Sequence, residues 1–267
     1  LKEARELADK GVRELILVAQ ETTVYGKDLY GKKSLHILLK KLCEIRGIRW
    51  IRILYCYPEE IYDELIETIR DEKKICHYLD IPIQHASDRI LKRMGRRTSK
   101  QELIDIVGKL RKEIPDIVLR TTLITGFPGE TEEDHEELKE FVDEMEFDRL
   151  GVFTYSPEEN TPAAEMADQV PEEVKEERRD ELMELQQEIS YDRGQDRIGQ
   201  ELLVMIEGKV ADESAYIGRT YGDAPKVDGY IFVQTGELLM TGDFAKVRVT
   251  GALEYDLIGV LSDEYTE

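Results

Sequence analysis

Short apolar segments alternate with amphipathic helical segments along the first 154 residues of the chain. Strands are predicted at residues 14–20, 50–55, 78–84, 117–125 and 150–154. Helices are predicted from residue 34, after residue 58, and over residues 86–93, 99–113 and 131–144. Strands that alternate with helices form parallel sheets, because each helix returns the chain to the same edge. The pattern predicts an α/β domain, either an open doubly wound sheet or a (β/α) barrel.

Polar or turn-forming residues follow each predicted strand. They are Gln20, Glu21, Tyr55, Cys56, Tyr57, Gln84, His85, the segment 125–131, Tyr155 and Ser156. Both candidate architectures bind their ligands at the carboxyl ends of the parallel strands. The sequence therefore predicts a binding face where these residues gather.

One strand, 117–125, carries a further pattern. Arg120, Thr122 and Ile124 alternate along it with Gly126 just beyond, so these residues are expected to share one face. An arginine on an inward face needs an anion, which could be a ligand or an acidic residue of the chain. After Gly126, Thr131 is expected to cap the following helix.

The predicted secondary structure changes near residue 198, from helices alternating with strands to strands alone. A highly charged helix from Pro171 is expected to act as a linker over 171–197. Beyond it, short apolar strands are predicted at 202–206, 230–233 and 246–249, with Asp228 and Gly229 at a turn. We predict two domains, residues 1–197 and residues 198–267, the second a small all-β barrel of five strands and OB-like type.

Charge favours a basic partner. The chain has 58 acidic and 37 basic residues, a net charge of -21. Residues 198–267 alone have 13 acidic and 5 basic residues, and 5 - 13 gives -8. Such a surface repels nucleic acid phosphates and attracts a cationic protein, although an acidic surface that only resists aggregation is the alternative. RNA is therefore not expected as a partner.

The three cysteines, Cys43, Cys56 and Cys76, are too widely spaced for a disulfide framework or a compact metal site. We expect them to be free and buried, in a reducing compartment such as the cytoplasm. No apolar run approaches the roughly 20 residues of a membrane-spanning helix. A protein without a membrane span and without metal ligands of its own is predicted.

Five motifs carry a resemblance to a known family. They are VAQETTVYG at 18–26, PIQHAS at 82–87, RTTLITGFPGET at 120–131, FTYSPEE at 153–159 and GRTYGDAP at 218–225. In this order they closely resemble the radical S-adenosylmethionine methylthiotransferases, and the last resembles that family's TRAM domain. The PIQHAS and QETT segments resemble the branch that modifies a ribosomal protein rather than the branch that modifies tRNA.

The resemblance implies a partial (β/α) barrel of the radical SAM type, followed by the TRAM barrel. It also implies S-adenosylmethionine and two [4Fe-4S] clusters as cofactors. The CxxxCxxC loop that holds the first cluster in the family does not occur in these residues. We therefore expect the chain to start within a domain and to be inactive alone.

The resemblance also implies a reaction. This is the transfer of a methylthio group to the β-carbon of one aspartate in the twelfth protein of the small ribosomal subunit, with an electron donor supplying two electrons. A monomer is expected. Methylthiolation of a tRNA adenosine and a binding module without catalysis are the alternatives.

The family pattern assigns these residues to the cofactor site: Gln20, Glu21, Gln84, His85, Arg120, Thr122, Ile124 and Gly126. Gln20 and Glu21 would accept hydrogen bonds from the methionine amino group, and Arg120 would pair with its carboxylate. Tyr155 and Ser156 are expected to contact substrate. The alternatives are an ordinary polar loop at Gln20, a structural histidine, an arginine paired with an acid, and packing for Tyr155.

Overall fold

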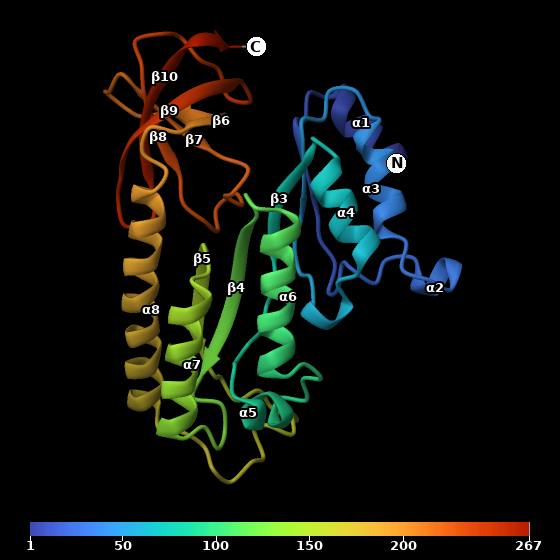
Figure 1. Ribbon diagram of the computed structural model, residues 1–267, viewed down its shortest axis with the longest axis vertical. Helices are drawn as coiled ribbons and strands as arrows, with labels where there is room; N and C mark the ends of the chain where they lie inside the picture. The colour runs from blue at the N-terminus through green and yellow to red at the C-terminus, as the bar shows by residue number, and fades with distance from the viewer. Residues whose placement is uncertain (267) are drawn as a thin grey trace.

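The computed structural model describes residues 1–266, with side chains to residue 262. Its first part is a curved parallel sheet covered by helices, and its last part is a small β-barrel at one end of that sheet (Figure 1). Glu267, the last residue of the predicted second domain, lies outside the described residues. None of the helices in residues 1–266 is long and apolar enough to cross a membrane.

All five strands of the sheet run parallel, in the order in which they occur along the chain. They are β1 (Glu14–Leu17), β2 (Trp50–Ile53), β3 (Ile75–Asp80), β4 (Val118–Thr125) and β5 (Arg149–Thr154). A consecutive order with a helix between neighbours is the arrangement of a (β/α) barrel, whereas a doubly wound sheet reverses its order at a switch point. The expected partial barrel is confirmed.

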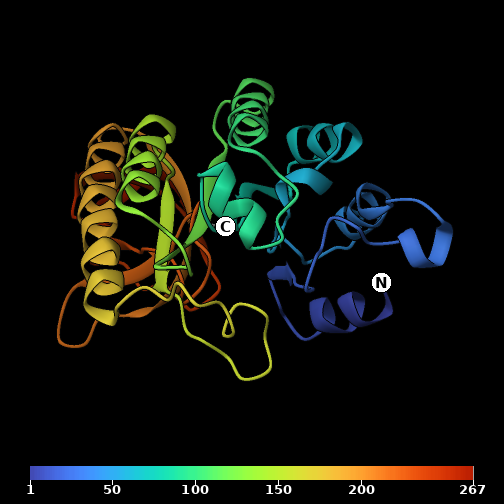
Figure 2. The same ribbon diagram turned by 90° about the horizontal axis from the view of Figure 1, so that it is seen from below.

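The helices of this part are α1 (Lys2–Asp9), α2 (Lys27–Tyr30), α3 (Leu35–Cys43), α4 (Asp63–Asp71), α5 (Asp88–Arg93), α6 (Lys100–Glu113) and α7 (Glu132–Met145), with a 3-10 turn at Pro58–Glu60. Most of them lie on the outer, convex face of the sheet, whereas the short α2 projects away from it and α5 lies beyond its carboxyl end (Figure 1 and Figure 2). Along β4, Leu119 and Leu123 are fully buried on the side of the main apolar core. The alternate residues Arg120, Thr122 and Ile124 are half-buried and face the other, concave side. The predicted alternation is confirmed.

Three of the strands end earlier than predicted. β1 ends at Leu17 rather than at residue 20, and β2 ends at Ile53 rather than at residue 55. β3 occupies Ile75–Asp80 instead of 78–84, because Pro82 cannot donate a backbone hydrogen bond to a neighbouring strand. Gln84 then rejoins the sheet as an isolated parallel bridge to Leu123. The polar residues after these strands thus lie in loops, not at the last strand position.

A long helix, α8 (Glu172–Gln195), joins the two parts. Its 24 residues span about 36 Å. In Figure 1 it runs beside α7 from the carboxyl end of the sheet to the β-barrel. The predicted linker helix is present, but it packs along β5 and α7 and is therefore part of the first structural unit as well.

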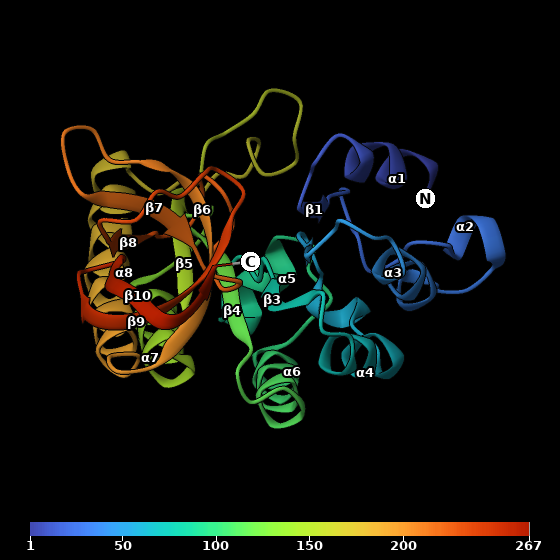
Figure 3. The ribbon, with the colours of Figure 1, turned by 90° about the horizontal axis from the view of Figure 1, so that it is seen from above.

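The second part is a closed five-stranded barrel, as predicted (Figure 3). Its strands are β6 (Glu201–Lys209), β7 (Ala215–Arg219), β8 (Ile231–Gln234), β9 (Phe244–Ala252) and β10 (Leu257–Thr266). Their order around the barrel is β10-β8-β7-β6-β9. A separate apolar core fills the barrel, with Val204, Ile231 and Val233 fully buried.

The two parts meet at the amino-terminal end of the parallel sheet. Trp50 at the start of β2 packs edge to face on Phe244 of the barrel, with ring centroids 4.9 Å apart. Glu14 at the start of β1 pairs with Arg219 of the barrel at 2.6 Å. The opposite, carboxyl end of the sheet is therefore left for ligands.

Candidate functional site

Four loops lie at the carboxyl end of the sheet, because parallel strands end at the same edge (Figure 1). They carry the predicted residues Gln20 after β1, Gln84 after β3, Gly126 after β4 and Tyr155 after β5. We call these loops the strand-end site. The prediction that these four positions lie at one edge is confirmed.

The loop after β1 has two polar side chains, one without a hydrogen-bond partner in the described residues and one that is hydrogen-bonded. Gln20 is exposed, and its amide has no hydrogen-bond partner within the described part of the chain. Glu21 accepts hydrogen bonds from the amides of Thr23 and Tyr57, both at 2.9 Å. Burial raises the pKa of Glu21, although these hydrogen bonds act in the other direction. Glu21 thus fastens its loop to the loop after β2, and its contact with a cofactor stays a prediction.

A cavity of about 590 Å³ lies along β1 and the loop that follows it. Its lining is mainly apolar, with Leu17, Val18 and Leu38 among its residues, and Glu21 lies on its wall. A pocket of this kind, apolar with one or two polar groups, suits a small organic ligand.

Gln84 holds an unusual backbone conformation. Its φ of 74° lies in the left-handed region, which costs energy for a residue with a side chain. Its amide donates to the Thr122 carbonyl at 2.9 Å, and its carbonyl accepts from the Ile124 amide at 2.8 Å. The side-chain amide has no partner among residues 1–262. A strained backbone that holds a free amide at the strand-end site fits a binding role.

His85 differs from the prediction. Its side chain is fully buried, and its Nδ1 accepts a hydrogen bond from the Ser87 amide at 2.9 Å. Its Nε2 lies 3.4 Å from the Glu130 carboxylate. With no exposed surface it does not contact a cofactor in this conformation, so the structural alternative describes His85.

Arg120 lies in a different place from the other predicted residues. It is six residues before Gly126, about 20 Å along an extended strand. Its guanidinium pairs with Asp80 at 2.8 Å and with Asp228 of the barrel at 3.3 Å. The acid-paired alternative therefore describes Arg120, and a contact with the methionine carboxylate would require both pairs to break.

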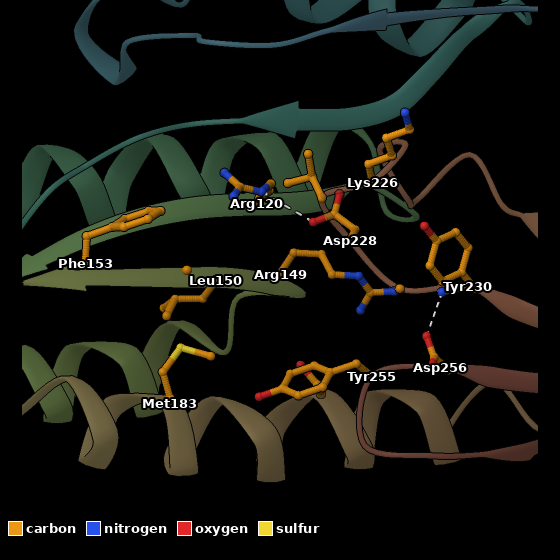
Figure 4. A pocket seen from close by; sticks show the side chains of 14 residues that line it. Arg120, Arg149, Leu150, Phe153, Met183, Lys226, Asp228, Tyr230, Tyr255 and Asp256 are labelled. Carbon is orange, nitrogen blue, oxygen red and sulfur yellow. Dashed lines mark hydrogen bonds and ion pairs between the residues drawn. The ribbon is translucent and has the colours of Figure 1, made fainter. Parts of the chain in front are cut away.

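The surroundings of Arg120 form a cavity of about 600 Å³ between β4, β5, α8 and the barrel (Figure 4). Figure 4 shows Arg120 facing Asp228, while Tyr255 and Met183 line the opposite wall. Arg149 also lines this cavity and pairs with the buried Asp223 at 2.6 Å. This cavity belongs to the junction of the two parts and not to the strand-end site.

The loop after β4 makes a tight turn into α7. Gly126 has a φ of 70°, and a Cβ there would lie 2.1 Å from Cγ of Lys175. Only glycine fits such a position. Thr131 and Asp134 form the predicted capping box, since the Thr131 side chain accepts from the Asp134 amide and the Asp134 side chain accepts from the Thr131 amide. The local sequence therefore determines the path of this loop.

Tyr155 is partly buried and Ser156 is exposed. The ring of Tyr155 packs edge to face on Phe127, with centroids 5.2 Å apart. Its hydroxyl is buried and has no hydrogen-bond partner within residues 1–262. A buried hydroxyl without a partner is costly, so a ligand that accepts its hydrogen bond would stabilise this site. Contact of Tyr155 and Ser156 with substrate stays a prediction.

Three residues at this end were not singled out from the sequence. Glu130 is buried in the loop after β4, where Arg178 of α8 pairs with it, and Lys175 of α8 lies against Gly126 of the same loop. Lys175 and Arg178 occur in a run of charged residues that resembles an exposed helix. Only the tertiary structure shows that these two cations face inward.

The cysteines are free, and Cys56 and Cys76 are buried. Burial raises the pKa of the Cys43 thiol to about 11 and that of Cys76 to about 12. Thiols with such pKa values stay protonated and are poor metal ligands. No group of three or more potential metal-binding side chains occurs in the part of the chain that the structure describes.

Comparison with known proteins places this geometry in a family. A model described as the radical SAM superfamily matches residues 1–142, more than half of the 267 residues. The chain belongs to the radical SAM superfamily. A second model, described as the TRAM domain, matches residues 198–261, which include most of the small barrel.

Curated relatives are similar over nearly the whole of this radical SAM chain. It is 66% identical to ribosomal protein uS12 methylthiotransferase RimO of Lachnoclostridium phytofermentans, over 97% of this chain and 59% of that protein. It is 54% identical to the protein of the same name from Clostridium botulinum strain Langeland, over 100% of this chain and 60% of that protein. The chain thus spans about three fifths of the length of these relatives.

A solved structure shares the fold. Coproporphyrinogen III oxidase (HemN) from Escherichia coli, described as a radical SAM enzyme, superposes with a TM-score of 0.57. The match covers 92% of this chain and 58% of that one, at 16% identity. This likeness supports the architecture and carries no further conclusion.

Proposed function

We propose that this chain is the sheet and TRAM part of an enzyme that transfers a methylthio group to an aspartate of the ribosomal protein uS12. The observation that carries the proposal is the 66% identity, over 97% of the chain, to a protein named for that reaction. The order of the strands and the closed barrel behind them agree with it.

The residues of the strand-end site fit S-adenosylmethionine. The amides of Gln20 and Gln84 have no partners in the described residues, and the Tyr155 hydroxyl is buried without one. Amides can accept from an amino group and donate to a carboxylate, which are the two polar ends of the methionine moiety. When bound, S-adenosylmethionine and the iron-sulfur clusters supply the radical and sulfur chemistry.

The residues of this chain bind and orient the cofactor and the substrate. In this proposal Gln20 and Gln84 hold the methionine end, and the apolar side chain of Ile124 contacts the remainder. Gly126 allows the loop to approach closely, because it has no Cβ. Tyr155 and Ser156, at the end of β5, present the substrate aspartate within contact distance of the reacting carbon.

The electrostatics of the TRAM barrel favour a protein substrate over tRNA. Of its five basic residues, Arg219 is buried between Glu14 and Glu207, and Lys246 faces Glu201 at 3.6 Å. Few cations therefore remain to bind phosphates, whereas the acidic surface attracts a basic protein. We propose a basic protein of the small ribosomal subunit as partner, an electron donor, a cytoplasmic location and a monomer.

The test uses the full-length native protein, reconstituted anaerobically with iron and sulfide and incubated with S-adenosylmethionine and a reductant. Purified uS12 and total tRNA are offered separately, and each is analysed by mass spectrometry. Replacement of one hydrogen of an aspartate by a methylthio group in uS12 alone is the expected result. Modified adenosine instead would establish a tRNA substrate, and full binding of uS12 without product would favour a binding module.

A further inference from the structure

The first turns of α8 carry two buried cations. Lys175 and Arg178 are only 4% and 6% exposed, whereas the adjacent Arg179 lies on the outer side and pairs with Asp180. Buried charges are retained only when they are paired and hydrogen-bonded. Besides the exposed Glu172 and Glu132, the partners of Lys175 and Arg178 lie at or next to the strand-end site.

Lys175 joins the ends of two neighbouring strands. Its Nζ donates to the Tyr155 carbonyl after β5 at 2.9 Å. Its own carbonyl accepts from Oγ1 of Thr125 at the end of β4 at 3.1 Å. Its side chain also fills the space beside Gly126 that a Cβ would occupy. Lys175 therefore fixes the spacing between the loops that follow β4 and β5.

Arg178 acts through Glu130. Its Nη1 donates to Oε1 of Glu130 at 2.9 Å, and Oε2 of the same carboxylate accepts from the Gly126 amide, also at 2.9 Å. The carboxylate is fully buried. Although burial alone would raise the pKa of Glu130, His85, the Gly126 amide and Arg178 together hold it below its ordinary value. An ionised Glu130 thus fixes the direction of the Gly126 amide.

His85 supports the same carboxylate from the loop after β3. The Ser87 amide donates to Nδ1 of His85, so Nε2 is the ring nitrogen that faces Glu130. Nε2 lies 3.4 Å from Oε2 of Glu130 without full hydrogen-bond geometry. Glu130 therefore connects three segments: the loop after β3, the loop after β4, and α8.

We propose that Lys175 and Arg178 make the start of α8 a positioning element for the cofactor, and not only a linker to the TRAM barrel. Through Glu130, Arg178 sets the orientation of the loop at Gly126, where S-adenosylmethionine is expected to bind. The proposal rests on the cofactor site of the proposed function and is independent of the identity of the substrate.

The test compares two adjacent arginines in the full-length, cluster-reconstituted protein. Arg178→Met removes the cation that faces Glu130, and Arg179→Met is the matched control on the outer side of the helix. The dissociation constant for S-adenosylmethionine is measured by calorimetry, and the exchange rate of the Gly126 amide by hydrogen exchange. We expect Arg178→Met to weaken binding about tenfold and speed the exchange, since a tenfold change corresponds to the loss of about one hydrogen bond to a charged group.

Arg178→Lys keeps the charge but cannot reproduce both guanidinium contacts, that of Nη1 with Glu130 and that of Nη2 with Glu132 at 3.1 Å, so it should give an intermediate affinity. Equal dissociation constants for Arg178→Met and Arg179→Met would overturn the proposal, even if the melting temperature of Arg178→Met falls. Should Arg178→Met fail to fold, Glu130→Gln decides the question. It keeps the shape of the side chain, and an unchanged affinity in that variant would equally overturn the proposal.

Discussion

Buried charges lie at both ends of the parallel sheet, and the two ends use them differently. At the amino-terminal end, Glu14 sits between Arg52 at 2.8 Å and Arg219 at 2.6 Å, so one carboxylate joins β1, β2 and the TRAM barrel. At the carboxyl end, Glu130 sits between Arg178 and the Gly126 amide and joins α8 to the loop after β4 within the first part of the chain. The first group connects segments 205 residues apart in sequence.

This difference separates two tasks. The amino-terminal end is joined to the barrel, because the barrel segment around Asp223 and Asp228 makes ion pairs and hydrogen bonds with Arg149, Arg120 and Tyr78. The carboxyl end keeps exposed or unpartnered polar groups that a ligand can use. Changes at the first end should therefore affect mainly folding and domain arrangement, and changes at the second mainly binding.

The largest expected effect is at the amino-terminal end. Arg52→Met removes a fully buried guanidinium and leaves Glu14 with one partner instead of two. Breaking a buried ion pair in this way should lower the free energy of unfolding by about 3–5 kcal/mol. Arg46→Met, on the exposed surface between α3 and β2, is the control and should change it by less than about 0.5 kcal/mol. Denaturant titration of both variants measures this; a similar small loss in both would mean that the charged junction does not hold the domains.

A steric change at the same end should cost somewhat less. A Cβ at Gly229 would lie 2.2 Å from the backbone oxygen of Tyr255, so Gly229→Ala must displace the main chain of the barrel. We expect a loss of about 3 kcal/mol, the upper part of the range for overpacking. At Gly236 a Cβ meets no atom within 4 Å, so Gly236→Ala is the matched control. Thermal unfolding that does not distinguish these two variants would contradict the close approach seen here.

At the carboxyl end, Asp134 should make stability depend on pH. Burial alone would raise the pKa of the Asp134 carboxyl. Hydrogen bonds from Arg89, Thr131 and Ser87 outweigh this effect and hold the pKa well below its ordinary value. A carboxyl with a lowered folded-state pKa contributes stability above the unfolded pKa of about 3.9 and loses it as the pH falls through the folded value. Asp134→Asn should therefore lose about 2 kcal/mol at pH 7, and its difference from the parent should shrink below about pH 4.

The measurement is a series of unfolding titrations between pH 7 and pH 3. Asp143→Asn is the control, because Asp143 lies exposed on the same helix and should change the free energy of unfolding by less than about 0.5 kcal/mol at pH 7. If the difference between Asp134→Asn and its parent stayed constant over this pH range, the contribution of Asp134 would not be that of an ionised carboxylate.

The sequence predicted the elements better than the partners of the charged residues. The alternation along β4, the capping box at Thr131 and the five-stranded barrel all follow from local patterns, and all are confirmed. The boundary of β3 was misplaced because the apolar segment continues past Pro82, and only pairing with β4 shows where the ladder ends.

The partners of Arg120 and the inward orientation of Arg178 could not be predicted. Arg120 pairs with Asp228, 108 residues later in the chain, and a single sequence with many acidic residues does not indicate which one is near. Arg178 and Arg179 are adjacent and chemically identical, so only the packing of α8 against the sheet distinguishes them. At both ends of the sheet, therefore, the partners and orientation of the charged residues could not be predicted from the sequence.

The smallest expected effect, the loss of a helix cap, distinguishes a change in stability from a change in cofactor binding. Ser99 and Thr131 form the same capping box, at the starts of α6 and α7 respectively. Ser99→Ala and Thr131→Ala should each lower the free energy of unfolding by about 1 kcal/mol, since each leaves one helix amide without its cap. Only Thr131 continues from the loop that starts at Gly126, so only Thr131→Ala should also weaken S-adenosylmethionine binding. Calorimetric titration of the two variants separates these effects, and equal losses of affinity would show that the loop after β4 has no special part in binding.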